Sequence, residues 1–123
     1  YTSTLKHNYV GDRYTLLLQK YCSAIAATTF ETSIKYWEIP ASGCLTFMEI
    51  TKKNNGNYLG YVDGETGIFI NEDNYENKFN EFLKEPDDSR WGKIAAAGRE
   101  FAMKNFNNDR AADFLVELME KYV

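Results

Sequence analysis

The chain has 123 residues, of which 44% are hydrophobic and 15% aromatic, enough to bury a core and form a single domain over residues 1–123. Its 14 basic and 18 acidic residues give a net charge of -4, and the basic residues do not cluster, which argues against a nucleic-acid partner. No apolar run reaches the ~18 residues that a membrane span needs, and no signal peptide opens the chain. We therefore expect a cytoplasmic protein without a membrane span. The chain starts at Tyr1 without a methionine, which suggests a piece of a longer protein.

The first half of the chain alternates predicted helices and strands. Residues 1–11 have little periodicity and are expected to form an extended lead-in, whereas apolar residues from Asp12 to residue 21 recur at helical spacing. Short apolar runs predict strands at 22–28, 44–50, 58–62 and 68–70, with a short helix at 34–42, a loop at 29–33 and turns at 51–57 and 63–67. Strand 22–28 is apolar on both faces, as in a sheet covered on both sides. The turn at 51–57 is expected to be the least ordered of these segments.

The second half is predicted to be helical. Three helices are expected at 74–86, 87–106 and 108–123, the first ending at a proline. The second has an apolar stripe that includes Trp91, Ile94 and Gly98. The third is expected to bury a larger apolar set, namely Ala111, Phe114, Leu115, Leu118 and Tyr122.

This order of elements predicts an α/β fold, a parallel sheet with flanking helices and a helical C-terminal tail. Ligands of such sheets bind at the carboxyl ends of the strands. If 22–28 and 58–62 are both strands, the loop 28–33 and the turn 63–67 follow them and lie at a possible site.

Several chemistries lack the residues that they need. The one histidine, His7, has no companion at metal-binding spacing, so we expect no metal. Cys22 and Cys44 lie in apolar surroundings, which suits buried thiols of a reducing compartment rather than nucleophiles. No glycine-rich phosphate loop is present, and we expect no cofactor.

Glu38 stands out because it interrupts the apolar helix "IKYWEIPASG". One interpretation is a solvated face, with Glu38 paired to Lys35 three residues earlier. The other is functional: a carboxylate beside the loop at the strand ends can accept both hydroxyls of a ribose, while nearby helix N-terminal amides hold a diphosphate. The residues alone leave both interpretations open.

Three segments carry a resemblance to a known family. "KYWEIPASGCLTF" resembles the segment that follows the pattern "lEAmAcGtPVv" in retaining glycosyltransferases of the GT-B type, and more closely the spore-maturation-protein-like branch. "LGYVDGETGIFI" is similar to the families' "v-x-d-G-x-t-G-l-l-v" segment. The helices from Tyr75 to Leu118 are similar to their closing pattern, so the resemblance covers roughly residues 14–122.

The resemblance implies a Rossmann-like C-terminal lobe that binds a nucleotide-diphosphate sugar, UDP- or GDP-linked. It implies that Glu38 binds the ribose hydroxyls and that Lys35 neutralises the leaving diphosphate, unless Lys35 is simply a solvated helix residue. Thr32 and Ser33 would offer backbone amides to phosphate or sugar. The family's first glutamate aligns with Phe30, while the actual acid, Glu31, is displaced by one position.

The sequence therefore predicts the donor-binding part of a glycosyltransferase, with its acceptor lobe and the early strands of the donor lobe absent from this chain. We expect little or no transfer activity from the chain alone, and no catalytic base can be named. The alternative is a non-catalytic α/β interaction module with a glycosyltransferase-like fold.

Overall fold

The computed structural model describes residues 12–123. The predicted lead-in, residues 1–11 with His7, lies outside the described residues. Three parallel strands form the sheet in the order β1-β2-β3, namely β1 (Ser23–Ala26), β2 (Leu45–Glu49) and β3 (Ile68–Ile70). The helices are α1 (Asp12–Leu18), α2 (Lys35–Ala41), the 3-10 helix η1 (Gly56–Leu59), α3 (Tyr75–Lys84), α4 (Ser89–Asn105) and α5 (Asn108–Tyr122).

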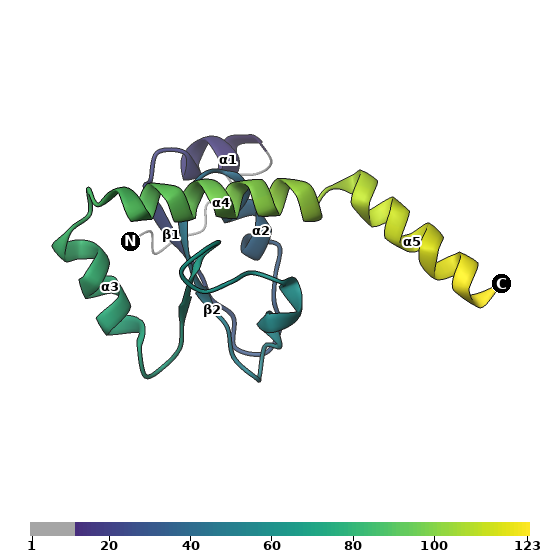
Figure 1. Cartoon of the computed structure of the whole chain (residues 1–123), viewed down its shortest axis with the longest axis horizontal. Helices are drawn as coiled ribbons and strands as arrows, with labels where there is room; N and C mark the ends of the chain where they lie inside the picture. Colours follow the sequence, from purple (N-terminus) through teal and green to yellow (C-terminus); the bar gives the residue numbers. More distant parts are fainter. Residues whose placement is uncertain (1–11) are drawn as a thin grey trace.

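The predicted α/β, Rossmann-like fold is confirmed, because every pair of neighbouring strands is parallel. Ile25 of β1 lies opposite Phe47 of β2, and Phe47 lies opposite Ile68 of β3. The connection from β1 to β2 runs through α2, as parallel pairing requires. Figure 1 shows α4 lying along the upper side of the body, where it contacts α2 and β2.

The central strand β2 is buried on both faces because its residues alternate between two apolar clusters. Leu45 and Phe47 belong to a cluster that α3 and α4 cover, and the Phe47 ring meets the Phe79 ring edge-on at 5.0 Å. Cys44 and Met48 belong to the other cluster, which contains buried residues of α2 and of the segment before β3. This alternation with a period of two explains why the whole segment reads as apolar.

The edge strand β1 does not follow the prediction of cover on both faces. Ala26 is fully buried, but the Ile25 side chain is 51% exposed. Cys22, predicted to be buried, is exposed as well, whereas Cys44 is buried and its thiol donates to the carbonyl oxygen of Leu18 at 3.0 Å. Among the described residues, β1 pairs with β2 alone, so its outer edge has no partner strand.

The predicted third strand at 58–62 is wrong. The chain forms η1 instead, flanked by Asn55 at φ 53° and Gly60 at φ 87°, two left-handed residues that are incompatible with an extended strand. The apolar residues of this segment are buried without strand pairing. Leu59 and Tyr61, on either side of Gly60, insert their side chains into the core.

The predicted buried face of the last helix is also wrong. α4 ends at Asn105, the ring of Phe106 stacks on Trp37 at 5.6 Å, and the chain turns before α5 begins. The N-cap of α5 is Asn107, whose side-chain oxygen accepts from the amide of Arg110 at 2.8 Å. Figure 1 shows α5 projecting away from the body, and it buries none of its residues.

A high-pH loss of stability is expected from Tyr61, whose hydroxyl donates to the carbonyl oxygen of Tyr36 at 2.7 Å. Burial raises the pKa of Tyr61 above its ordinary value of 10.0, so the folded chain favours the neutral phenol. Its contribution is therefore complete below pH 10 and falls as the pH rises above that value. The measurement is denaturant unfolding from about pH 9 to about pH 11.

The control isolates Tyr61 from the other groups that titrate in this range. Tyr61→Phe is expected to flatten the fall of the free energy of unfolding with pH, whereas Tyr58→Phe, at a tyrosine that is 66% exposed, leaves the slope of the parent chain. Equal slopes for the parent and Tyr61→Phe contradict the prediction.

Candidate functional site

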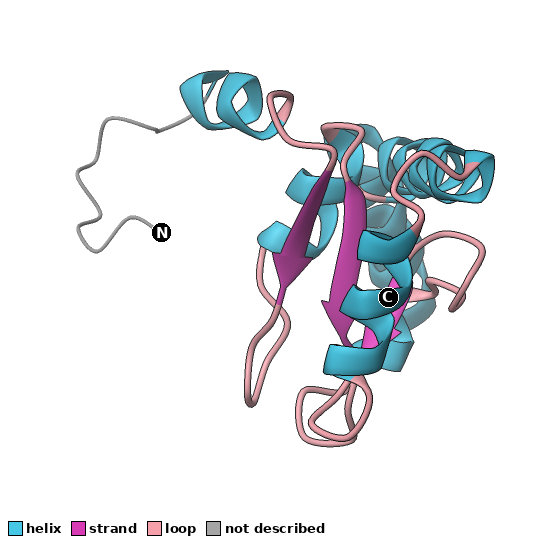
Figure 2. Cartoon of the chain, turned by 90° about the vertical axis from the view of Figure 1, so that its left-hand side faces the viewer, coloured by secondary structure: helices cyan, strands magenta, loops and turns pink. Residues whose placement is uncertain are grey.

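The carboxyl ends of the three parallel strands meet at one edge of the sheet, and three connections follow them. They are the β1 loop (residues 27–34), the β2 turn (residues 50–55) and the β3 turn (residues 71–74). Figure 2 shows these loops gathered at the end to which the strand arrows point. Such an edge is where open α/β sheets bind ligands.

The structure gathers three of the predicted site residues where the β1 loop enters α2. The Thr32 hydroxyl lies 3.2 Å from the hydroxyl of Tyr58 in η1. The Ser33 hydroxyl oxygen is buried and has no hydrogen-bond partner among the described residues, and Lys35 is the half-buried first residue of α2. Glu31 is exposed two residues before Ser33. No ligand contact follows from this geometry alone, so the roles of these residues stay predictions.

Glu38 lies in the first turn of α2 and is half-buried. Burial raises the pKa of Tyr14 in α1, and the negative charge of Glu38 raises it further. Among residues 12–123 no ion pair joins Glu38 to Lys35 within 4.0 Å. The ion pair between Glu38 and Lys35, which the interpretation as a solvated face suggested, is therefore not formed.

A buried asparagine holds this edge together, although the sequence suggested disorder for its segment. Asn54 is 2% exposed. Its side-chain amide donates to the carbonyl oxygens of Thr28 at 3.1 Å and Glu49 at 2.7 Å, and to the hydroxyl of Tyr36 at 3.3 Å. Its side-chain oxygen accepts from the amides of Thr51 and Gly56 at 3.1 Å and 2.9 Å. One side chain thus fixes the β1 loop, the end of β2 and the β2 turn relative to one another.

Tyr36 of α2 completes this network. Its hydroxyl donates to the carbonyl oxygen of Glu49 at 2.9 Å and lies 3.3 Å from the hydroxyl of Thr28. Burial raises the pKa of Tyr36. The hydrogen bond with Thr28 lowers this pKa in part, and the negative charge of Glu49 raises it further. The phenol therefore stays protonated and keeps donating at neutral pH.

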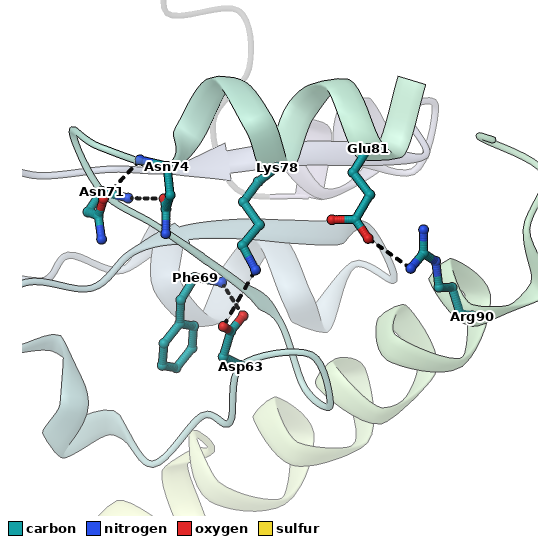
Figure 3. Close-up of polar contacts among 7 residues, drawn as sticks. All are labelled: Asp63, Phe69, Asn71, Asn74, Lys78, Glu81 and Arg90. Atoms are coloured by element: carbon teal, nitrogen blue, oxygen red, sulfur yellow. Dashed lines mark hydrogen bonds and ion pairs between the residues drawn. The ribbon is translucent and has the colours of Figure 1, made fainter. Parts of the chain in front are cut away.

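The turn "DGETG", predicted at the carboxyl edge, lies at the opposite end of the sheet. Because residues 58–62 are not a strand, the turn precedes β3 instead of following a strand. Gly64 has φ 76°, which agrees with a backbone role for this glycine. Asp63 is more than an exposed turn residue. Figure 3 shows its carboxylate accepting from the amide of Phe69 at 2.8 Å and pairing with Lys78 at 3.7 Å.

Two negative findings concern residues 12–123. No group of three or more His, Cys, Asp or Glu side chains is arranged to hold a metal ion. No helix combines the length and the apolar character that crossing a membrane requires.

A family model described as "Glycosyl transferase-like" matches residues 2–117. No curated protein and no solved structure matches the chain. The matched range contains the whole carboxyl edge, from the β1 loop through the β3 turn.

Proposed function

Because the chain belongs to the glycosyl transferase-like family, we propose that it is the donor-binding part of a glycosyltransferase. It binds a nucleotide-diphosphate sugar, UDP- or GDP-linked, for transfer to an acceptor. The observation that carries the proposal is the position of the β1 loop and the first turn of α2 at the carboxyl edge of a parallel sheet, inside the matched range.

Each predicted residue has a role that its position supports. The backbone amides of Thr32 and Ser33 face the phosphates, and Lys35, at the start of α2, offsets the charge that the diphosphate gains as it leaves. Glu38, in the first turn of α2, accepts the ribose hydroxyls. Glu31, exposed in the β1 loop, contacts the donor sugar.

The acceptor side of the reaction comes from a second lobe in this proposal. Within residues 12–123 no strand pairs with the outer edge of β1, and the Ile25 side chain is exposed. Both observations support further strands beside β1 in the complete donor lobe. The missing strands also account for the low activity that we expect from this chain alone.

Substitution of Glu38 by glutamine is expected to weaken UDP binding about tenfold, since an amide replaces a charged acceptor of the ribose hydroxyls. Titration of the 123-residue chain with UDP and with GDP, followed by amide shifts in NMR, measures the affinity and locates the ligand. The expected shifts lie at Thr32, Lys35 and Glu38.

Glu100→Gln is the matched control, because Glu100 is exposed in the middle of α4. It is expected to bind UDP like the parent. Shifts that never reach the β1 loop or α2 mean that the nucleotide site is elsewhere or needs the missing strands. Loss of the fold in Glu38→Gln instead indicates a structural carboxylate.

A second candidate function, a non-catalytic interaction module, is favoured by α5. Its apolar side chains are exposed, with Phe114 at 62% and Leu115 at 56%, as in a surface that another protein covers. The full-length gene product separates the two functions: a second Rossmann-like lobe before Tyr1 supports the transferase, whereas a scaffold context supports the module.

A further inference from the structure

A crevice of about 380 Å³ opens at the carboxyl edge, between the β2 turn and the β3 turn. The end of β2 supplies Glu49, and the β1 loop supplies Thr29. The two facing turns supply the remaining lining residues, namely Ile50, Thr51, Lys52, Lys53, Asn71, Glu72 and Asp73. The volume falls in the range of small-ligand sites. None of these residues belongs to the predicted set around Glu38.

The positively and negatively charged side chains of the crevice come from different walls. Lys52 and Lys53 belong to the β2 turn, whereas Glu72 and Asp73 belong to the β3 turn, with the half-buried Glu49 from β2 among them. Within residues 12–123, these five side chains form no ion pair closer than 4.0 Å and no hydrogen bond. Both sets remain free for a ligand that carries an anionic group at one end and hydroxyl groups at the other.

Both walls are held by side-chain hydrogen bonds to the backbone. Asn54 fixes the β2 turn through the amides of Thr51 and Gly56. In the β3 turn, Asn71 and Asn74 bond reciprocally: the Asn74 side-chain oxygen accepts from the Asn71 amide at 2.8 Å, and the Asn71 side-chain oxygen accepts from the Asn74 amide at 3.1 Å. Figure 3 shows this pair. The charged side chains therefore stand on preorganised backbone.

An apolar hollow of about 160 Å³ adjoins the crevice and shares Glu49, Asn71 and Glu72 with it. Its other lining residues are Ala27, Ile70 and Tyr75, and the Tyr75 side chain is 41% exposed. An aromatic ring beside carboxylates and an amide suits a sugar, whose C–H face is apolar and whose rim carries hydroxyl groups.

We propose that the crevice and the adjoining hollow bind a sugar phosphate. Lys52 and Lys53 hold the phosphate, the carboxylates of Glu49 and Glu72 accept hydroxyl groups, and Tyr75 packs against the ring. The inference deepens the proposed function, on which it rests for the choice of a sugar among polyhydroxylated ligands. The site is separate from the nucleotide site at α2, because it lies between the second and third strand ends.

The test titrates the 123-residue chain with glucose 1-phosphate, methyl glucoside, inorganic phosphate and UDP, each followed by amide shifts. Glucose 1-phosphate is expected to shift Glu49, Lys53 and Asn71, and to bind about tenfold more tightly than inorganic phosphate or methyl glucoside. The double variant Lys52→Ala/Lys53→Ala is expected to weaken this binding at least about tenfold. Lys93→Ala, at an exposed lysine of α4, is the control and leaves it unchanged.

The outcomes separate this inference from the proposed function. Shifts with UDP at Thr32, Lys35 and Glu38, without any crevice shift from glucose 1-phosphate, overturn the inference and leave the nucleotide site standing. If glucose 1-phosphate shifts the crevice residues and UDP shifts no residue, the inference stands and the nucleotide site at α2 is overturned. Equal affinity for inorganic phosphate and glucose 1-phosphate also overturns the inference, because the lysines then bind a bare anion. A second variant, Glu72→Gln, is expected to weaken glucose 1-phosphate about fivefold while leaving inorganic phosphate unaffected.

Discussion

Replacing Asn54 with alanine is expected to lower the free energy of unfolding by about 3 kcal/mol. The change removes five hydrogen bonds of a side chain that is 2% exposed. It also leaves the carbonyl oxygen of Thr28 without this donor, whereas that of Glu49 keeps the hydroxyl of Tyr36. A buried polar group left unsatisfied costs more than its hydrogen bond contributes. Urea unfolding of the parent and the variant measures the difference.

Asn57→Ala is the matched control, because Asn57 belongs to the adjoining η1 and its side chain is exposed. We expect it to change the free energy of unfolding by less than about 0.5 kcal/mol. A loss below about 1 kcal/mol for Asn54→Ala means that water replaces the amide, and that the β1 loop and the β2 turn do not depend on it.

Gly98→Ala is expected to destabilise the chain by about 2–3 kcal/mol, although alanine favours helices. A Cβ atom at this buried position overlaps the carbonyl oxygen of Thr66 and touches Pro40 of α2 at 3.9 Å. Since the obstacle is backbone rather than a flexible side chain, α4 must move away from the turn before β3. The cost of that displacement exceeds the helix-propensity gain of about 1 kcal/mol.

The same helix supplies the opposite control. A Cβ atom at Gly92 has nothing within 4 Å, and the residue is exposed in α4. Gly92→Ala is therefore expected to stabilise the chain by about 0.5–1 kcal/mol. Thermal unfolding of both variants measures the pair, and two shifts of the same sign contradict the close approach of α4 to Thr66.

The sheet and its helices could be predicted because their apolar periodicity is set by local geometry. β2 alternates between two clusters, and α4 presents Trp91, Ile94 and Gly98 along one stripe as the spacing indicates. The segment 58–62 has the apolar character of a strand, yet its Gly60 has φ 87°. The sign of a φ angle cannot be read from a pattern of apolar residues. That one error also displaced the turn 63–67 to the wrong end of the sheet.

The candidate site was predictable only where it is continuous in the sequence. Thr32, Ser33 and Lys35 lie together because they are neighbours along the chain. The contacts of Asn54 with Thr28 and Tyr36 span 26 and 18 residues, and a polar turn gives no sign of which distant carbonyl oxygen its asparagine will reach. The separated charges of the crevice likewise come from two turns that only the parallel pairing of β2 and β3 brings face to face.

The projection of α5 has a consequence for how the chain unfolds. Because none of its residues is buried, its hydrogen bonds open without disturbing the sheet, and a lone helix of 15 residues is only marginally stable in water. Amide hydrogen exchange along α5 should therefore be governed by local fraying, while α4 and β2 exchange through opening of the whole domain. Helical signal lost early on heating then reports on α5 alone, so circular dichroism and core tryptophan fluorescence should give different transition midpoints for one and the same chain.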